Sequence, residues 1–355
     1  MKDLRYCLDK MQAAGRLAHI KTPVDAVHEL SGISAKLEGG KALVFDHVKG
    51  YDFPLTTGMW WNRENVAAIF DRPASEIPWL FADAVDSLKT SPVAPVVAED
   101  APSQEVVISE PDLYKIPIPT HALLDGGPYF SNCVIIARDP DTGVRNASVH
   151  RLMVTGKDRL GLLMDMGRHL RDYYERAEAR GEPLEITISN GMHPAYFVAA
   201  TTPSSAAPID VDELAVASYL LGEPARLSKS LTVDVEGLAD AEMVMEASCA
   251  RARGAVRRGP RLLCDPCGQM GCKGQDDNYA QEPNLQHAPP WQRGLERPGP
   301  GHRGEPLPHY KQAGEGPEER VHDPWRQSLS RRAPDGSSVE RACKERHHGG
   351  LRGVL

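Results

Sequence analysis

The stretch Asp139-Pro-Asp-Thr-Gly-Val-Arg-Asn-Ala-Ser-Val-His-Arg151 decides how the middle of the chain folds. Its first five residues are typical of turns, and they separate the apolar run Cys133–Ala137 from a second run that ends at Val154. Two such runs that flank a short turn predict a β-hairpin. We therefore expect antiparallel β-structure at the centre of the chain.

The second strand of this hairpin carries chemically active side chains. Because strand side chains alternate between faces, Asn146, Ser148 and His150 are predicted on one face and Arg151 on the other. A purely structural hairpin would bury aliphatic residues on one of these faces. Polar groups on both faces instead favour the binding of an anion and a metal ion.

The pattern Asn146-x-Ser148-x-x-Arg151 after this turn resembles the signature of the UbiD-like decarboxylases, which use prenylated flavin mononucleotide (prenylated FMN). The resemblance runs from about Leu4 to Glu246, and its motifs are jointly specific because they occur in order. The further matching segments are Ile116-Pro-Ile-Pro-Thr-His121, Leu124-Asp-Gly-Gly-Pro-Tyr129, Gly167-Arg-His169, Asn190-Gly-Met-His-Pro-Ala195, Asp212-Glu-Leu-Ala215 and Ala241-Glu-Met-Val-Met-Glu246.

The resemblance implies a role for five residues. Asn146, His169 and Glu213 would hold a divalent metal against the flavin phosphate. Arg151 would hold the substrate carboxylate, and Ser148 would lie near the cofactor.

The chemistry of these groups agrees with the implied roles. An amide oxygen, an imidazole and a carboxylate suit Mn²⁺ or Mg²⁺, with K⁺ as a further candidate ion, and the lack of a thiolate argues against zinc. Taken singly, His169 could be a surface residue, Glu213 could favour a helix dipole, and Arg151 could be solvated. Together and in family order they favour a metal site beside a carboxylate-binding arginine. His150 and Arg168 receive no role.

The predicted fold class is α+β. Residues 1–100 are expected to form an α/β domain, with apolar helical stripes at Leu4–Met11, Val24–Ile33 and Trp79–Ala84 and a buried strand at Ala42–Phe45. Ser91–Ser103 is a linker candidate. Residues 104–250 are mostly β, and helices are expected at Arg168–Arg180 and Val211–Leu221. Short strands and turns predict a barrel-like sheet, and the resemblance implies a flavin-reductase-like split β-barrel that binds prenylated FMN.

Composition narrows the functional classes. A net charge of −8 gives no basic surface for nucleic acid. The beginning of the sequence lacks the apolar stretch of a signal peptide, and no run reaches the ~20 apolar residues that span a bilayer. Seven cysteines, an odd number, disfavour a secreted disulfide framework. We expect a cytoplasmic protein.

The character of the sequence changes in residues 251–355, which read as a disordered tail as written. Ile, Phe and Thr disappear there, while Arg, Gly and Pro dominate. Cys264, Cys267 and Cys272 form a C-x₂-C-x₄-C pattern, but no second ligand pair follows at the spacing of a zinc finger, so the zinc signal is weak.

A frame slip between about Glu246 and Arg253 explains more of this tail. Codons for Arg253–Arg258, read one base later, permit Glu-Gly-Pro-Phe-Gly-Glu, the acid-bearing motif of the family. Several further family-like strings follow in the same shifted frame. As written, Arg253 and Arg258 stand where the resemblance implies proton-transferring glutamates. The literal chain is therefore expected to lack its general acid and to be inactive.

The resemblance implies a non-oxidative carboxy-lyase that acts on a small aromatic or α,β-unsaturated carboxylic acid, or the reverse carboxylation. A flavin prenyltransferase would supply the cofactor, and relatives commonly form homo-oligomers. Two alternatives remain open at this stage. A split-barrel flavin reductase would need no metal on the phosphate, and a truncated, catalytically inactive flavin-binding subunit would suit the literal tail.

Overall fold

The predicted hairpin is present and consists of two long antiparallel strands, β6 (Tyr129–Arg138) and β7 (Arg145–Gly156). The turn closes through hydrogen bonds from the Asp139 amide to the Val144 carbonyl and from the Gly143 amide to the Asp139 carbonyl, both at 2.8 Å. The Asp139 side chain also accepts from the Asp141 amide. Gly143 has φ +74°, a left-handed conformation that favours glycine.

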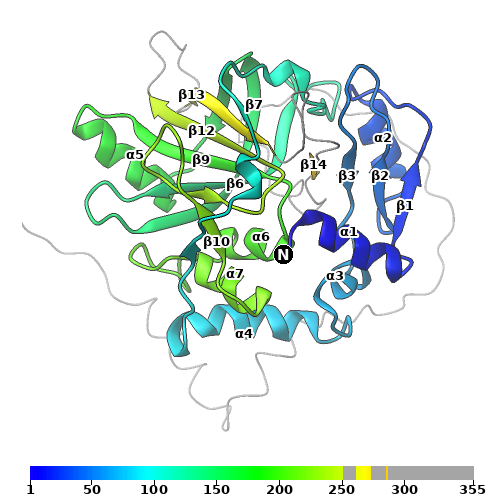
Figure 1. Cartoon of the computed structure of the whole chain (residues 1–355), viewed down its shortest axis with the longest axis horizontal. Helices are drawn as coiled ribbons and strands as arrows, with labels where there is room; N and C mark the ends of the chain where they lie inside the picture. The colour runs from blue at the N-terminus through cyan, green and yellow to red at the C-terminus, as the bar shows by residue number, and fades with distance from the viewer. Residues whose placement is uncertain (251–260, 273–284, 287–355) are drawn as a thin grey trace, which may run out of the picture. The chain divides into compact units, whose positions relative to one another are not determined.

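The hairpin is the centre of a seven-stranded sheet in this computed structural model, which describes residues 1–250, 261–272 and 285–286 (Figure 1). All of these lie in one compact unit, Met1–Arg297. The other strands of the sheet are β5 (Val106–Ile108), β8 (Arg159–Leu163), β9 (Leu184–Asn190), β12 (Met243–Ala250) and β13 (Arg261–Cys272).

Six of these strands form a closed ring. The sheet order is β12-β9-β6-β7-β8-β13-β5, and a further antiparallel pairing joins β12 to β13. We call β6, β7, β8, β9, β12 and β13 the strand ring. Because β13 pairs with β8 on one side and β12 on the other, the ring has neither of these strands as a free edge.

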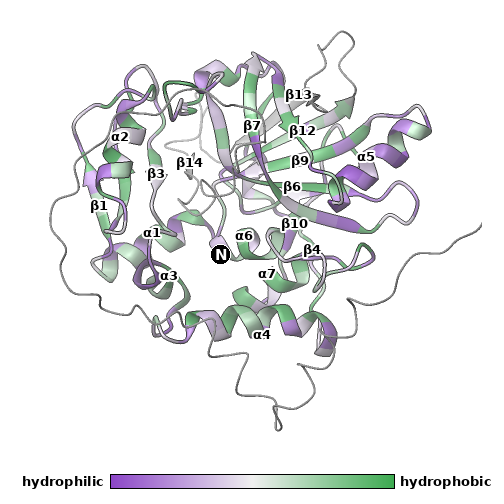
Figure 2. Cartoon of the chain, turned by 180° about the vertical axis from the view of Figure 1, so that it is seen from behind, coloured by the Kyte–Doolittle hydropathy of each residue, from purple (hydrophilic) through white to green (hydrophobic). Residues whose placement is uncertain are grey.

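Both faces of β6 are buried, which explains its nearly continuous apolar sequence. Cys133, Ile135 and Ala137 belong to one core cluster with inward residues of β9 and β12. Val134 and Ile136 belong to a second cluster, against helices α6 (Pro194–Ala200) and α7 (Leu214–Leu221). In contrast, α5 (His169–Ala179) is largely hydrophilic (Figure 2).

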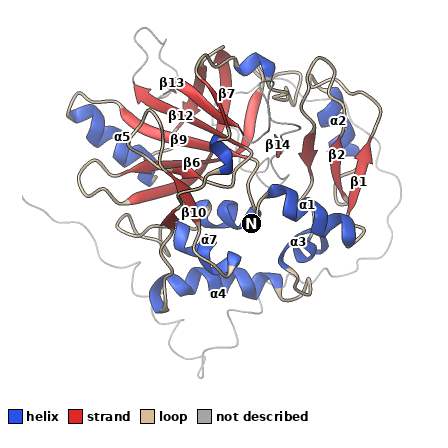
Figure 3. Cartoon of the chain, viewed as in Figure 1, coloured by secondary structure: helices blue, strands red, loops and turns tan. Residues whose placement is uncertain are grey.

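The N-terminal residues form a smaller mixed sheet with helices (Figure 3). The strands β1 (Leu17–Ile20) and β2 (Ala42–Phe45) are parallel, and β2 is antiparallel to β3 (Leu55–Thr57), which pairs with β14 (Leu285–Gln286). The helices are α1 (Leu4–Ala13), α2 (Glu29–Lys36), α3 (Arg63–Phe70) and α4 (Ile77–Thr90). Helix α4 contacts α7.

The segment between these two parts is partly structured. The linker predicted at Ser91–Ser103 contains β4 (Val96–Val97), which pairs with β10 (Arg226–Ser228) and through it with β11 (Gly237–Leu238). Two short 3₁₀ helices follow at Pro102–Gln104 and Leu113–Lys115. The fold is thus α+β, as expected.

Several local expectations need correction. The stripe that begins at Val24 is not helical at its start, because Val24 and Val27 lie in isolated bridges and the helix begins at Glu29. Trp79 lies on the predicted helix but is 64% exposed, so it is not core.

Two segments of the predicted tail are described, and both form strands. Arg261–Cys272 pairs along both its sides as β13, and Leu285–Gln286 forms β14. The rest of the predicted tail, 251–260, 273–284 and 287–355, lies outside the described residues. In the part that is described, no helix is both long and apolar enough to cross a membrane.

Candidate functional site

The polar side chains of β7 lie on one face in the order predicted. The Asn146 amide donates to Ser148 Oγ at 3.3 Å, and His150 Nε2 lies 3.2 Å from the same oxygen. Their cross-strand partners are Ala137, Ile135 and Cys133, all in the inward-facing core cluster. The expectation that Asn146, Ser148 and His150 share a face is therefore confirmed.

Glu213 reaches this strand where β8 does not cover it. Strand β8 pairs with β7 only from Leu152 onward, so the amide of Ala147 is left to another acceptor. Glu213 Oε2 accepts from that amide at 3.1 Å. Because Ala147 follows Asn146 directly, this bond places the Glu213 carboxylate next to the first predicted ligand.

His169 supplies the third candidate group from the first residue of α5. Its Nδ1 lies 3.5 Å from Glu213 Oε1, which is long for a hydrogen bond. Its side chain is mostly buried, and Asn146 and Glu213 are almost fully buried. The structure thus brings Glu213 against His169 on one side and against the backbone beside Asn146 on the other.

The electrostatics around Glu213 fit a bound cation. Its side chain is 5% exposed, and among the described residues neither lysine nor arginine pairs with it. Burial raises the pKa of Glu213 above its usual value, while His169 and the Ala147 amide act in the opposite direction. A buried carboxylate with neither a lysine nor an arginine partner is costly, and a divalent ion would relieve that cost. Amide, imidazole and carboxylate donors suit Mn²⁺ or Mg²⁺.

Arg151 lies at an irregularity of the hairpin. The pairing of β6 and β7 shifts between Phe130 and Cys133, so Ser131 and Asn132 together oppose Arg151. Such a bulge inserts an extra residue, bends the strand and changes the direction of nearby side chains. Arg151 is exposed, as the binding of an external carboxylate requires.

His150 received no role from the sequence, and the structure gives it a place beside Ser148. Its Nδ1 lies 3.3 Å from the Leu163 carbonyl at the end of β8. Burial lowers the pKa of His150, and this effect exceeds the opposite influence of the Leu163 carbonyl. His150 is therefore a neutral link between Ser148 and β8.

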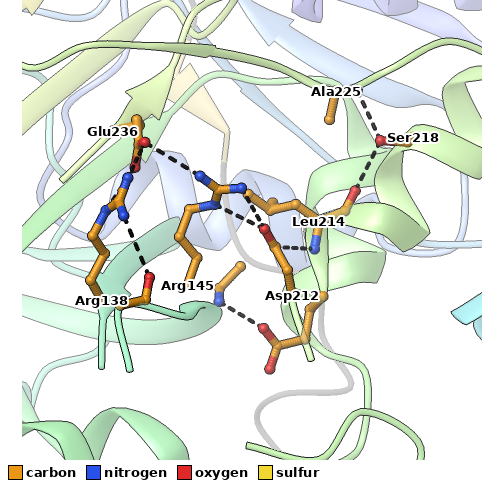
Figure 4. A network of polar contacts seen from close by, with 10 residues as sticks. Arg138, Arg145, Asp212, Leu214, Ser218, Ala225 and Glu236 are labelled. Atoms are coloured by element: carbon orange, nitrogen blue, oxygen red, sulfur yellow. Dashed lines mark hydrogen bonds and ion pairs between the residues drawn. The ribbon is translucent and has the colours of Figure 1, made fainter. Parts of the chain in front are cut away.

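A charged network beside the site was missed in the sequence (Figure 4). Arg145 pairs with Asp212 at 2.8 Å and with Glu236 at 3.3 Å, and Arg138 also pairs with Glu236. The available signal was the position of Arg145 and Asp212, each directly before a predicted metal ligand. Arg145 and Asp212 are 67 residues apart in the sequence, so no local sequence pattern indicates their contact.

The cysteine pattern of the tail stays untested. Cys264, Cys267 and Cys272 fall on β13, and the arrangement of their side chains lies outside what the structure describes. Over the described part of the chain, no cluster of three or more His, Cys, Asp and Glu residues could hold a metal ion. The candidate set above differs because one of its three groups is the Asn146 amide.

Two family models match the chain. Residues 8–84 match the N-terminal domain of the 3-octaprenyl-4-hydroxybenzoate carboxy-lyases, and residues 95–261 match the Rift-related domain of the same family. The second match contains all five predicted site residues. It ends at Arg261, near the point where the sequence changes character.

Two proteins with similar sequences agree with these matches. An uncharacterized protein from the cooM 5′ region of Rhodospirillum rubrum is 45% identical over 69% of this chain and 53% of its own length. Anhydromevalonate phosphate decarboxylase of Methanothermobacter thermautotrophicus is 39% identical over 58% of this chain and 46% of its own length. The chain therefore spans about half the length of these relatives.

A solved structure extends the agreement to three dimensions. An evolved dimeric form of the UbiD-class enzyme HmfF from Pelotomaculum thermopropionicum, in complex with prFMN, superposes with a TM-score of 0.71. The two are 35% identical, and the match covers 81% of this chain and 67% of that one. The motifs, the fold and these matches together lead to one conclusion: the chain belongs to the UbiD family.

Proposed function

We propose that this protein is a non-oxidative decarboxylase of a small aromatic or α,β-unsaturated carboxylic acid, or a carboxylase in the reverse direction. One observation carries the proposal: the Glu213 carboxylate lies against both His169 and the backbone beside Asn146. A buried carboxylate, an imidazole and an amide on three separate elements suit a metal-bound phosphate better than a structural role.

The residues have distinct parts in this proposal. Asn146, His169 and Glu213 hold Mn²⁺ or Mg²⁺ against the phosphate of the flavin, with K⁺ as an additional ion. Arg151 binds the substrate carboxylate through its planar fork, and Ser148 lies beside the cofactor. Prenylated FMN supplies the electron sink for loss of carbon dioxide, and the protein orients the acid and excludes water.

The cofactor assignment has two supports. The related HmfF structure contains prFMN, and the strand ring offers a sheet of the kind expected for a flavin-reductase-like split β-barrel. A flavin prenyltransferase would provide the cofactor. We place the protein in the cytoplasm as a homo-oligomer, with no nucleic-acid partner.

The chain as written lacks the proton donor that this reaction requires. We propose that residues after about 250 are read one base out of frame, so that Arg253 and Arg258 replace two glutamates. The chain as written is then expected to hold flavin poorly and not to turn over, because its general acid is absent. Intact mass and tail peptides measure the true frame. Peptides that contain Cys264-Asp-Pro-Cys267 as written would exclude the slip.

The central experiment coexpresses the frame-corrected chain with a flavin prenyltransferase and measures release of carbon dioxide from aromatic and unsaturated acids. Glu213→Gln should lower Mn²⁺ affinity by more than the roughly 10–100-fold that loss of a residue supporting a ligand costs, because the neutral amide no longer balances the ion. Glu178→Gln, on an exposed helical glutamate of α5, is the matched control and should bind Mn²⁺ normally. Wild-type protein that binds flavin but not Mn²⁺ or Mg²⁺ would contradict the proposal.

The same preparation separates the alternatives. A flavin reductase would oxidise a nicotinamide and would be indifferent to chelator. An inactive flavin-binding subunit would bind flavin and metal but release no carbon dioxide from any acid, even with the corrected tail.

A further inference from the structure

The Arg145–Asp212 ion pair joins two segments that each carry a candidate metal ligand. Arg145 directly precedes Asn146 on β7, and Asp212 directly precedes Glu213 at the start of α7. Two nitrogens of the guanidinium, Nε and Nη2, each lie 2.8 Å from Asp212 Oδ2. Both side chains are about one-fifth exposed, so solvent screens this pair less than a surface pair.

Two contacts therefore flank Asn146. On one side the Arg145 side chain holds Asp212, and on the other the Ala147 amide donates to Glu213 at 3.1 Å. This pattern fixes the segment 145–147 against the segment 212–213 at two consecutive points. A shift of one segment along the other would break both contacts and change the distance between Asn146 and Glu213.

Asp212 also sets the beginning of α7. Its second carboxylate oxygen, Oδ1, accepts from the Leu214 amide at 3.0 Å (Figure 4). In the sequence, Glu213 stands between these two hydrogen-bonded residues. Within the helix, Ser218 accepts from the Ala225 amide. The bond between Asp212 and Leu214 spans Glu213 and limits the directions its side chain can take.

Glu236 holds the arginine in place. Arg138 and Arg145 are direct cross-strand partners, and two like charges in this position repel. Glu236 pairs with both of them, and its own carbonyl accepts from Thr187 Oγ1 on β9 at 2.7 Å. The guanidinium of Arg145 is therefore held between Glu236 and Asp212 and has a defined orientation.

From this geometry we propose that Arg145 and Asp212 are positioning residues, which hold Asn146 and Glu213 at the separation that a divalent cation requires. The inference rests on the metal site of the proposed function. It assigns the ion pair a task that goes beyond stabilising the fold, since neighbours of metal ligands commonly tune affinity 10–100-fold.

The direction in which Arg145→Met changes Mn²⁺ affinity distinguishes a positioning role of Arg145 from a purely electrostatic one. Arg145 carries a positive charge near the site, so its field alone opposes binding of a cation. If only the field mattered, Arg145→Met would strengthen Mn²⁺ binding. If the ion pair positions the ligands, Arg145→Met weakens Mn²⁺ binding despite the loss of a repelling charge. Arg145→Lys keeps the charge and one contact, and it should recover part of the affinity.

Asp112→Asn provides the matched control. Asp112 accepts from the Tyr114 amide two residues later, as Asp212 does from Leu214, and pairs with Lys157 at 3.6 Å. Its side chain is 19% exposed, against 22% for Asp212. Each substitution therefore removes an ion pair made by a partly buried aspartate, and the new asparagine can still accept the capping hydrogen bond. The two pairs differ in the cation, because Lys157 is 72% exposed and Arg145 is 20% exposed.

The test titrates the full-length chain with Mn²⁺ in the presence of FMN and follows free Mn²⁺ by electron paramagnetic resonance. Arg145→Met and Asp212→Asn should each weaken binding about tenfold, and Asp112→Asn should leave it unchanged. Circular dichroism and urea unfolding check that each variant is folded.

Each remaining outcome overturns a stated claim. Folded Arg145→Met protein that binds Mn²⁺ as well as or better than wild type overturns the positioning role and leaves the metal site intact. Wild-type protein that fails to bind Mn²⁺ overturns the proposed metal site and this inference with it. Loss of binding in Asp112→Asn as well would show that any ion-pair loss has this effect, and it would also overturn the positioning role.

Discussion

His193 is a single residue whose pKa the protein interior lowers strongly. Its ring is almost fully buried, lies edge-on to Phe70 with ring centres 5.4 Å apart, and accepts from the Ala195 amide at the start of α6. Burial, reinforced by Lys2, lowers the pKa of His193 to about 3, although Asp3 acts in the opposite direction. The imidazole is therefore a neutral helix cap.

This shift makes stability depend on pH. In the unfolded chain a histidine takes up a proton below about pH 6.5, whereas folded His193 stays neutral down to about pH 3. The unfolded state then binds more protons, so stability falls as pH decreases through this window, by up to about 1.4 kcal/mol per pH unit. His193→Asn keeps a capping acceptor but cannot titrate, so its unfolding free energy should vary less steeply with pH.

Urea unfolding at several pH values between about 6.5 and 4 measures the slope. His47→Asn, at an exposed histidine, is the control and should keep the wild-type slope. Equal slopes for His193→Asn and wild type would show that His193 does not titrate as its burial predicts.

The sequence identified the candidate metal ligands but not the residues that contact and position them. Asn146, His169 and Glu213 were found because they fall on motifs of a known family. Arg145 and Asp212 were not found, because their contact depends on where α7 meets β7 and not on local spacing. The burial that shifts the pKa of His193 is likewise a property of tertiary packing.

At the scale of elements, helix α1 is held to the strand ring by a charged contact. Arg5 lies on one face of α1, and its Nε and Nη2 donate to the two carboxylate oxygens of Glu242, at 2.9 and 3.1 Å. Glu242 directly precedes β12 and is fully buried, whereas Arg5 is 41% exposed. The pair therefore connects the N-terminal helix to the beginning of a ring strand.

Removal of this arginine should be costly. Arg5→Met leaves a buried carboxylate without this guanidinium, and loss of one partner of such a pair typically costs about 3 kcal/mol. Lys10→Met on the same helix breaks the exposed Lys10–Asp71 pair, which solvent screens, and should change stability much less. Urea unfolding of both variants tests the contrast, and equal losses would show that burial of Glu242 does not set the cost.

Elements with a clear apolar pattern were predicted well, and short ones were not. The predicted helix at Leu4–Met11 and the strand Ala42–Phe45 correspond closely to α1 and β2, because their buried residues recur at the helical spacing or form a continuous apolar run. Strands β4 and β11 have two residues each, and such pairings arise from tertiary contacts. Val27 fits the helical stripe, yet it is exposed and pairs with Thr120.

At the scale of the molecule, closure of the ring depends on β13. This strand pairs with Leu160–Leu163 of β8 and with most of β12, so it covers the two strands that would otherwise end the sheet. Ladder bonds involve backbone groups, so a strand here does not require a particular set of side chains. The proposed proton transfer, in contrast, requires glutamate side chains. Under the proposed frame slip, closure of the ring is therefore expected to persist while turnover is lost.

A chain that stops after Ala250 tests the role of this closure. It lacks β13, so the backbone groups of β8 and β12 that face it become unpaired, and exposed edges of this kind promote association between chains. We expect a lower melting temperature and soluble aggregates in size-exclusion chromatography. A chain that stops after Arg297 retains the compact unit with β13 and β14, and is the control. If both truncated chains melt alike and remain monodisperse, β13 does not contribute to closure, and the ring must be stabilised by the packing of its remaining strands.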